Sequence, residues 1–151
     1  MKKSNFYENK QHGSSKFPFE YYFIDSSCPR FVMPAHWHKE FEIIRIVRGG
    51  LELHLNNAGY ELREGDIITV DCASIHRGVP TDDCIYECVV FNLGMLAKGQ
   101  SDTVRALIDP IINSEATAIT LLKRGDSESY EYTLSLFEAA QKCDKFYELE
   151  V

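Results

Sequence analysis

Short apolar runs alternate with turn residues from Phe19 to Phe91. Residues 51–55 show the pattern most clearly, because leucines occupy every second position and Glu52 and His54 lie between them. A period of two is typical of a half-buried strand. The pattern predicts strands over residues 19–24, 30–33, 40–47, 51–55, 60–63, 66–70, 75–79 and 84–91. Strands at such regular spacing are typical of an antiparallel sandwich or barrel.

The apolar period changes after Asn92. Residues 102–112 carry apolar side chains three and four positions apart, which predicts a helix, and Pro110 predicts a break near its end. One more strand is expected over residues 119–122. The chain therefore divides into a strand-rich first part and a helical second part.

A longer helix is expected to begin at Asp126 or Ser127, either of which can cap it. Its apolar stripe consists of Tyr130, Leu134 and Phe137 with Ala140 or Gln141. This stripe is expected to pack on the core of its own chain, and the alternative is that it forms the contact between two copies in a dimer. Asp144 predicts the cap of a further helix. Because that helical pattern meets no stop signal before Val151, the chain is predicted to be part of a longer protein.

Composition and charge limit the function further. The 151 residues, of which 44% are hydrophobic, suit one globular domain. No apolar run is long enough to cross a bilayer, and the polar N-terminus is not a secretory signal. Five cysteines without framework spacing predict reduced thiols in the cytoplasm. A net charge of −7 predicts that this chain by itself makes no contact with nucleic acid or membrane.

His36, His38 and Glu42 follow one another at spacings of two and four. In one extended strand these side chains would point to the same face, and His76 from a neighbouring strand would complete the group. Imidazole and carboxylate are ligands that divalent transition metals prefer. Two readings stay open at this point: a metal site, or the polar floor of a binding pocket.

The same residues carry a resemblance to a known family. His36-x-His38-x3-Glu42-x6-Gly49 matches the first cupin motif in full, and Gly65-x5-Asp71-x-Ala73-x2-His76 is similar to the second motif with substitutions. The family usually has proline at Asp71 and glycine at Ala73, and Pro80 stands where it has asparagine. The segment from Pro34 to Ile44, with its His-Trp-His core, resembles the N-terminal effector-binding domain of AraC-type transcription regulators.

The resemblance implies a mainly β fold: a cupin double-stranded β-helix, or jelly-roll barrel, followed by C-terminal α-helices. It implies a flexible N-terminal arm (1–16), a barrel (17–95), a short helix and connecting strand (96–125) and a helical dimerisation segment (126–151). A small polar metabolite, for instance a sugar, is expected to bind in the lumen as effector. DNA is expected to be bound by a separate helix-turn-helix domain, and the chain is expected to form a homodimer through its C-terminal helices.

The resemblance implies no required cofactor, because the family commonly works without a metal. If one binds, the ligands are His36, His38, Glu42 and His76, and the ion is Zn, Ni, Fe or Mn. The effector pocket is expected to contain the same four residues with Tyr86 and Arg30. Arg30 either anchors an anionic effector or is solvated. Tyr86 either lines the lumen or packs in the core.

Three further residues near the cluster have alternative roles. Trp37 is expected to point outside the lumen rather than stack on a ligand. Glu40 either supports a ligand histidine or lies at the rim, and His54 is expected to be exposed.

The alternative function is a metal-dependent cupin enzyme of oxygenase or isomerase type. Its acid or base would have to come from Glu40, Tyr86 or Asp71, none of which has a spacing that fixes a role.

Overall fold

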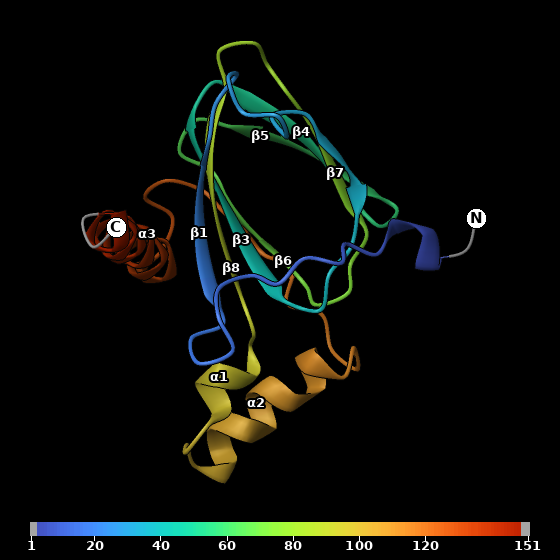
Figure 1. Ribbon diagram of the computed structural model, residues 1–151, viewed down its shortest axis with the longest axis vertical. Coiled ribbons are helices and arrows are strands. Elements are labelled where there is room, and N and C mark those ends of the chain that lie inside the picture. Colours follow the sequence, from blue (N-terminus) through green and yellow to red (C-terminus); the bar gives the residue numbers. More distant parts are fainter. Residues whose placement is uncertain (1–2, 149–151) are drawn as a thin grey trace.

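Two antiparallel β-sheets face each other (Figure 1). This computed structural model describes residues 3–148. One sheet has the order β1-β8-β3-β6-β9 and the other the order β2-β7-β4-β5. The strands are β1 (Phe19–Ile24), β2 (Met33–His36), β3 (Phe41–Arg48), β4 (Gly50–Leu55), β5 (Ala58–Arg63), β6 (Ile67–Val70), β7 (His76–Pro80), β8 (Ile85–Phe91) and β9 (Leu121–Leu122). The predicted double-stranded β-helix is confirmed.

The hairpin of β4 and β5 shows how local sequence sets register. Leu51, Leu53 and Leu55 are buried, as their alternation predicts. The chain reverses between Leu55 and its partner Ala58, and Asn56 adopts a φ of 51°. Asparagine tolerates this left-handed conformation better than other non-glycine residues do, which makes it suitable for tight hairpins.

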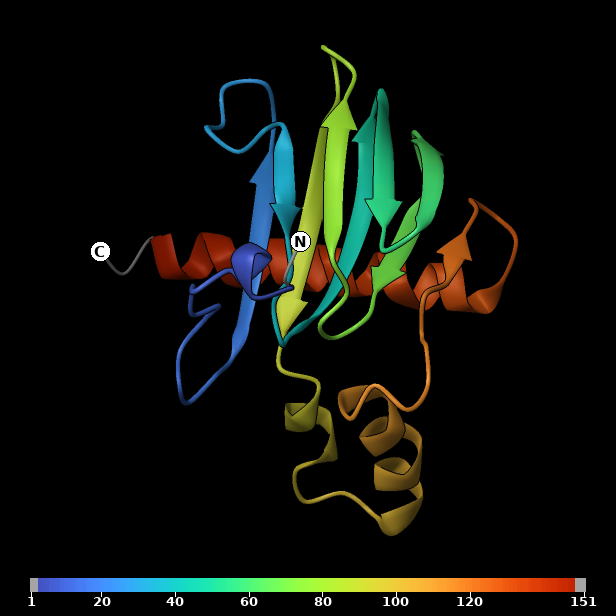
Figure 2. The same ribbon diagram turned by 90° about the vertical axis from the view of Figure 1, so that its right-hand side faces the viewer.

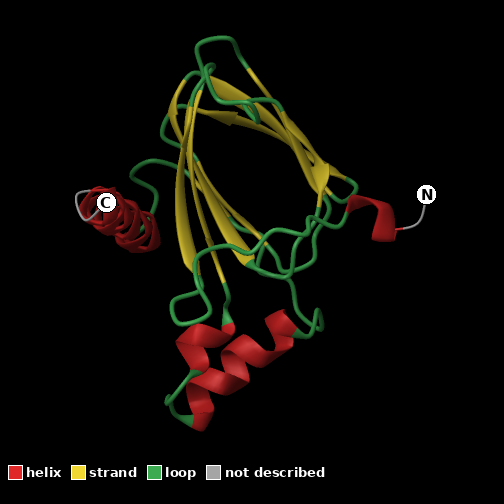
Figure 3. Ribbon diagram, viewed as in Figure 1, coloured by secondary structure: helices red, strands yellow, loops and turns green. Residues whose placement is uncertain are grey.

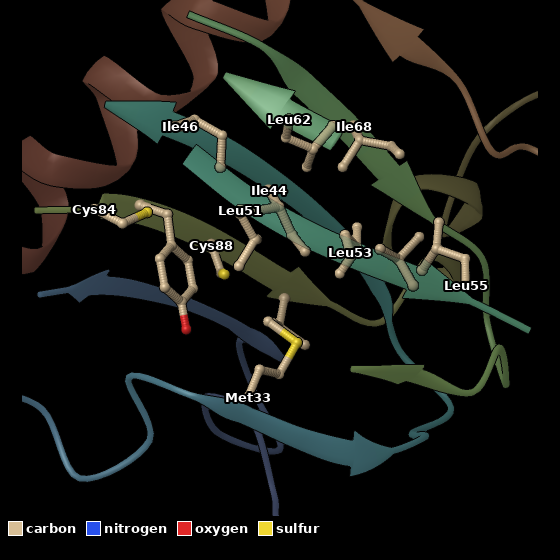
Figure 4. Close-up of a cluster of buried hydrophobic side chains, with 13 residues drawn as sticks. Met33, Ile44, Ile46, Leu51, Leu53, Leu55, Leu62, Ile68, Cys84 and Cys88 are labelled. Atoms are coloured by element: carbon tan, nitrogen blue, oxygen red, sulfur yellow. The ribbon is translucent and has the colours of Figure 1, made fainter. Parts of the chain in front are cut away.

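A core of aliphatic side chains fills much of the space between the sheets (Figure 4). Ile44, Ile46, Leu53 and Ile68 have no exposed surface. Met33, Tyr86 and Cys88 belong to the same cluster but approach it from β2 and β8. The barrel is therefore solid along part of its length, and the functional side chains gather where this packing ends.

The helix α3 (Glu128–Glu148) covers the outer face of the five-stranded sheet (Figures 1 and 2). Tyr130, Phe137 and Ala140 are buried there against side chains of that sheet. The predicted stripe thus faces the core. The backbone N–H of Tyr130 donates to the Ser127 hydroxyl at 3.3 Å, which fits the predicted cap. The expected break at Asp144 is wrong, because α3 continues through it.

The helices α1 (Gly94–Ala97) and α2 (Asp102–Ile112) lie beside one end of the barrel (Figure 2). α2 has the predicted bounds and includes Pro110 in its last turn. The predicted strand over 119–122 is shorter than expected, since only Leu121–Leu122 pairs with β6. Across residues 3–148 no helix is both long and apolar enough to cross a membrane.

Residues 3–16, which the sequence predicts to fray, lie along the barrel and contact it repeatedly. Both backbone groups of Trp37 pair with this segment: its N–H donates to Phe6 at 2.8 Å, and its carbonyl accepts from Glu8 at 2.9 Å. The Trp37 indole donates to the Lys3 carbonyl at 2.7 Å and packs on Tyr7 with ring centroids 4.7 Å apart. We call residues 3–16 the arm. Long-range contacts order the arm, and local periodicity does not reveal them.

A candidate metal centre beside an apolar cavity

The four predicted ligands converge, although not from one strand. His36 ends β2, His38 lies in the connection that follows, Glu42 is in β3 and His76 begins β7. β2 and β7 pair so that His36 and His76 lie opposite each other. One ligand atom from each of the four residues lies within 4.8 Å of the others. The expected geometry of a single continuous strand is wrong, because the chain bends at residues 39–40 between the two sheets.

Backbone carbonyls fix the tautomer of all three histidines. The Nδ1 atoms of His36, His38 and His76 lie 2.8, 3.1 and 2.9 Å from the carbonyl oxygens of Pro34, Glu40 and Ser74. A carbonyl can only accept, so each Nδ1 must carry the hydrogen. Each Nε2 is then left with a lone pair unless a second proton binds. Histidines that ligate metals are usually oriented in this way.

The Nε2 atoms face a carboxylate that also accepts. Glu42 Oε2 lies 3.0 Å from His38 Nε2 and 3.1 Å from His76 Nε2. A proton on His38 satisfies the first contact. His76 Nε2 is nevertheless buried without a hydrogen-bond partner, although Glu42 Oε2 lies 3.1 Å away. Buried polar atoms are normally satisfied, so this nitrogen is suited to ligate a cation.

The spacing of these atoms suits one divalent ion. Metal–ligand bonds of about 2.1 Å place neighbouring ligand atoms about 3.0 Å apart in an octahedron and about 3.4 Å apart in a tetrahedron. The two contacts of Glu42, at 3.0 and 3.1 Å, and the spread of the four ligand atoms within 4.8 Å leave room for one such ion. Three nitrogens and one oxygen would leave two positions of an octahedron for water or another ligand. The residues therefore fit a bound transition metal.

The protonation of the cluster follows from its burial and its internal charges. Burial acts to raise the pKa of Glu42, but the imidazoles of His38 and His76 hold it well below its usual value. Burial acts to lower the pKa of His38, yet the Glu42 carboxylate raises it. Burial and the neighbouring His76 lower the pKa of His36 to about 4. The carboxylate is thus ionised, and His36 presents a free lone pair at neutral pH.

A cavity of about 410 Å³ opens beside this cluster. Most of its wall is apolar, and Glu8 brings together the polar groups of Arg30, His12 and His36. The wall is formed by the arm (Glu8, Lys10, His12), β1 (Tyr22, Phe23, Ile24), the following loop (Cys28, Pro29, Arg30), β2 (Met33, His36), His38, Glu42 of β3 and β8 (Tyr86, Cys88, Val90). Its volume lies within the range of about 300–1,000 Å³ that is usual for small-molecule sites.

The structure separates the predicted pocket residues by what they contact. Arg30 lines the cavity and is ion-paired with Glu8. Tyr86 also lines it, but its hydroxyl donates to the Phe31 carbonyl at 3.0 Å. His76 does not line the cavity and lies behind it, 1% exposed.

The structure also shows what Trp37, Glu40 and His54 contact. Trp37 packs on the arm, outside the cavity wall. His38 contacts the backbone carbonyl of Glu40 at 3.1 Å, whereas the Glu40 carboxylate is 3.8 Å away. His54 is partly exposed and pairs with Glu52 at 2.7 Å.

Sequence reasoning missed the arm residues of the site. His12, to which the sequence assigns no role, is 5% exposed and pairs with the Tyr22 hydroxyl at 2.7 Å. The Glu8 carboxylate reaches Arg30, and lies 3.3 Å from His12 and 3.9 Å from His36. The spacing of Glu8 and His12, four residues apart, is the only local signal, and it predicts a helix rather than this extended arm.

Comparison with known families identifies the fold. A family model described as the AraC-like ligand binding domain matches residues 19–140. The chain belongs to this family. No curated protein matches the chain significantly. The family places the cavity in a ligand-binding domain of regulatory type, which agrees with the resemblance carried by the histidine motif.

Solved structures show distant likeness to this AraC-like ligand-binding domain. ToxT from Vibrio cholerae has 13% identity and a TM-score of 0.48, covering 85% of this chain and 47% of its own. An RmlC-like cupin protein from Methanocaldococcus jannaschii has 15% identity and a TM-score of 0.41, covering 54% of this chain and 74% of its own. A Cupin 2 conserved barrel domain protein from Salinispora arenicola has 24% identity and a TM-score of 0.41, covering 53% and 66%.

Proposed function

We propose that the chain is the effector-sensing domain of a cytoplasmic AraC-type transcription regulator. The observation that supports this most directly is the cavity of about 410 Å³ beside the His/Glu cluster, in a chain of the AraC-like ligand-binding family. A small molecule in the cavity would contact the arm, both sheets and the cluster at once. Binding that favours one arrangement of these parts shifts their equilibrium, which is what a sensor requires.

A divalent transition metal held by His36, His38, Glu42 and His76 is part of this proposal. When bound, such an ion would supply a Lewis-acidic centre beside the cavity. The chain's own contribution is to orient three imidazoles through backbone carbonyls and to keep the Glu42 carboxylate ionised. Support comes from the buried, unpartnered Nε2 of His76.

DNA contact is assigned to a separate helix-turn-helix domain of the regulator. The net charge of −7 opposes association with phosphate backbones. The homodimer through C-terminal helices stays a prediction. Because Tyr130 and Phe137 are buried against their own sheet, contact between copies through α3 would have to use the opposite face, where Tyr132 is 73% exposed.

Narrowing the cavity tests the sensor function. Cys28 lines the cavity at its partly exposed rim, so Cys28→Trp fills space without entering the core. In the full-length regulator we expect this variant to lose its reporter response to inducing metabolites while keeping its expression level. Cys143→Trp, on the exposed side of α3, is the matched control. A full response from Cys28→Trp would contradict an effector site here.

A metal-dependent enzyme is the second candidate, favoured by the four metal-ligating side chains that lie together. Of the three acid–base candidates that the sequence offers, Glu40, Tyr86 and Asp71, only Tyr86 belongs to the described cavity wall. The Tyr86 hydroxyl is engaged by Phe31, and burial raises the pKa of the Cys88 thiol well above its usual value. Turnover that appears with added Fe²⁺ or Mn²⁺ and disappears in His76→Gln would favour the enzyme over the sensor.

A further inference from the structure

A carboxylate of the chain itself lies among the basic groups of the cavity wall. The Glu8 side chain is 11% exposed and accepts from the Arg30 guanidinium. Its other oxygen lies 3.3 Å from His12 Nε2 and 3.9 Å from His36 Nε2. These basic groups come from the loop after β1, the arm and β2, so they form a built site for one carboxylate.

The hydroxyl groups of the cavity wall are already paired. The Tyr22 hydroxyl contacts Lys10 Nζ and His12 Nδ1, each at 2.7 Å, and the Tyr86 hydroxyl donates to Phe31. A sugar in this cavity could pair with His36 and Glu42, but its hydroxyl groups that face the apolar wall would be unpaired, which costs free energy for each group. The lining therefore favours a ligand with one polar end.

Ring and sulfur groups dominate the apolar wall. Tyr22 and Phe23 present aromatic surface, and Met33 presents a thioether, whereas Tyr86 lies behind them with no exposed surface. Aromatic rings pack favourably against one another and against methionine sulfur. An aromatic body therefore suits these walls better than a hydroxylated one.

We propose that the cavity binds an aromatic monocarboxylate, whose carboxylate replaces that of Glu8 on Arg30 and whose ring lies among Tyr22, Phe23 and Met33. This inference rests on the proposed sensor function and names the ligand class for the same cavity. Glu8 then acts as an internal competitor, since it holds the anion position when no ligand is bound. A cationic head group is disfavoured in the position of the Glu8 carboxylate, because it would meet Arg30.

Displacement of the Glu8 side chain would loosen the part of the arm that contacts Trp37, and the fluorescence of Trp37 can report this change. Glu8 is also the residue whose backbone N–H pairs with Trp37 at 2.9 Å. Trp37 is the only tryptophan of the chain, and its ring packs on Tyr7 of the arm. Its fluorescence therefore reports on the arm without any label.

Titration with 4-phenylbutyrate tests the inference, with EDTA present so that a metal does not hold the carboxylate. Trp37 fluorescence and isothermal calorimetry measure the affinity. We expect binding of the acid but not of 4-phenylbutanol, 4-phenylbutylamine or a hexose. Glu8→Gln should tighten binding about tenfold, because it removes a charged competitor. Arg30→Gln should weaken it by at least about tenfold, and its half-exposed side chain makes misfolding a minor concern.

Glu61→Gln is the matched control. Glu61 is an exposed carboxylate of β5 outside the cavity wall, so its loss should leave the affinity unchanged. Equal binding of acid, alcohol and amine would overturn the inference, as would an affinity that Glu8→Gln does not improve. If the hexose binds and the acid does not, the ligand class is wrong and the sensor function stands. If Cys28→Trp leaves the reporter response intact, the sensor function falls as well.

Discussion

At the residue scale, the functional cluster depends on which nitrogen of each histidine is free. The motif predicts the ligand types, and the structure places all four side chains together. It does not predict the tautomers, because these depend on carbonyls two residues away from each histidine, at Pro34, Glu40 and Ser74. Whether a carbonyl two residues distant meets its own imidazole depends on local backbone bends, which side-chain spacing does not encode.

The lone pairs of this cluster predict stoichiometric metal binding. Protein stripped with EDTA should bind one equivalent of Co²⁺ or Zn²⁺, measured by cobalt absorption or calorimetry. Removing a ligand with His76→Gln should weaken binding by at least about 100-fold, since even partners outside the ligand set are worth about 10- to 100-fold. His54→Gln, at a partly exposed histidine paired with Glu52, should bind as the wild type does. Equal affinity in both variants would exclude the site.

At the element scale, the sequence predicts which strands form where the alternation is clear, but it does not always predict the residues at which they begin and end. β1 has the predicted bounds because its apolar run ends at turn residues on both sides. β2 is displaced from the predicted 30–33 to Met33–His36, since Pro34 does not stop it. β2 is an edge strand of its sheet, and proline is tolerated where no ladder hydrogen bond is lost. Asp144 likewise fails to end α3, because one cap-type residue does not outweigh a continuing helix.

Because α3 is docked on the five-stranded sheet, we expect one substitution in this helix to lower the stability of the fold strongly. Phe137 has no exposed surface and packs between the helix and the five-stranded sheet. Phe137→Ala should lower the free energy of unfolding by about 3–5 kcal/mol, measured by urea denaturation. Tyr132→Ala, on the exposed face of the same helix, should change it by less than about 0.5 kcal/mol. Similar midpoints for both variants would mean that α3 is not docked as described.

The arm has a pH dependence that follows from Glu8. The imidazole of His12 and, against the cost of burial, the Arg30 guanidinium lower the pKa of Glu8 from 4.5 to about 2. Because this pKa is depressed in the docked arm, its stabilisation is full above about pH 4.5 and is lost as the pH falls towards 2. Trp37 fluorescence should therefore show arm release between these values. Glu8→Gln should remove that transition, and an unchanged transition in this variant would assign it to another group.

At the scale of the whole molecule, the arm contacts the residue that lies between two of the candidate metal ligands. Trp37 stands between His36 and His38, and the arm holds both of its backbone groups. The arm therefore helps to position two ligands, although it supplies none of them. This connection was not predictable from sequence, because residues about thirty positions apart meet only once the barrel has formed.

The contacts of the arm with Trp37 predict reciprocal coupling between arm docking and metal affinity. Deleting residues 1–12 removes the contacts that hold Trp37 and the negative charge of Glu8 near His36. We expect Zn²⁺ affinity to fall about fivefold or more, within the usual range of coupling free energies. By linkage, Zn²⁺ must protect the arm of the intact chain by the same factor, measured as resistance to limited proteolysis. Zn²⁺ affinity that is equal with and without the arm would show that the two are independent.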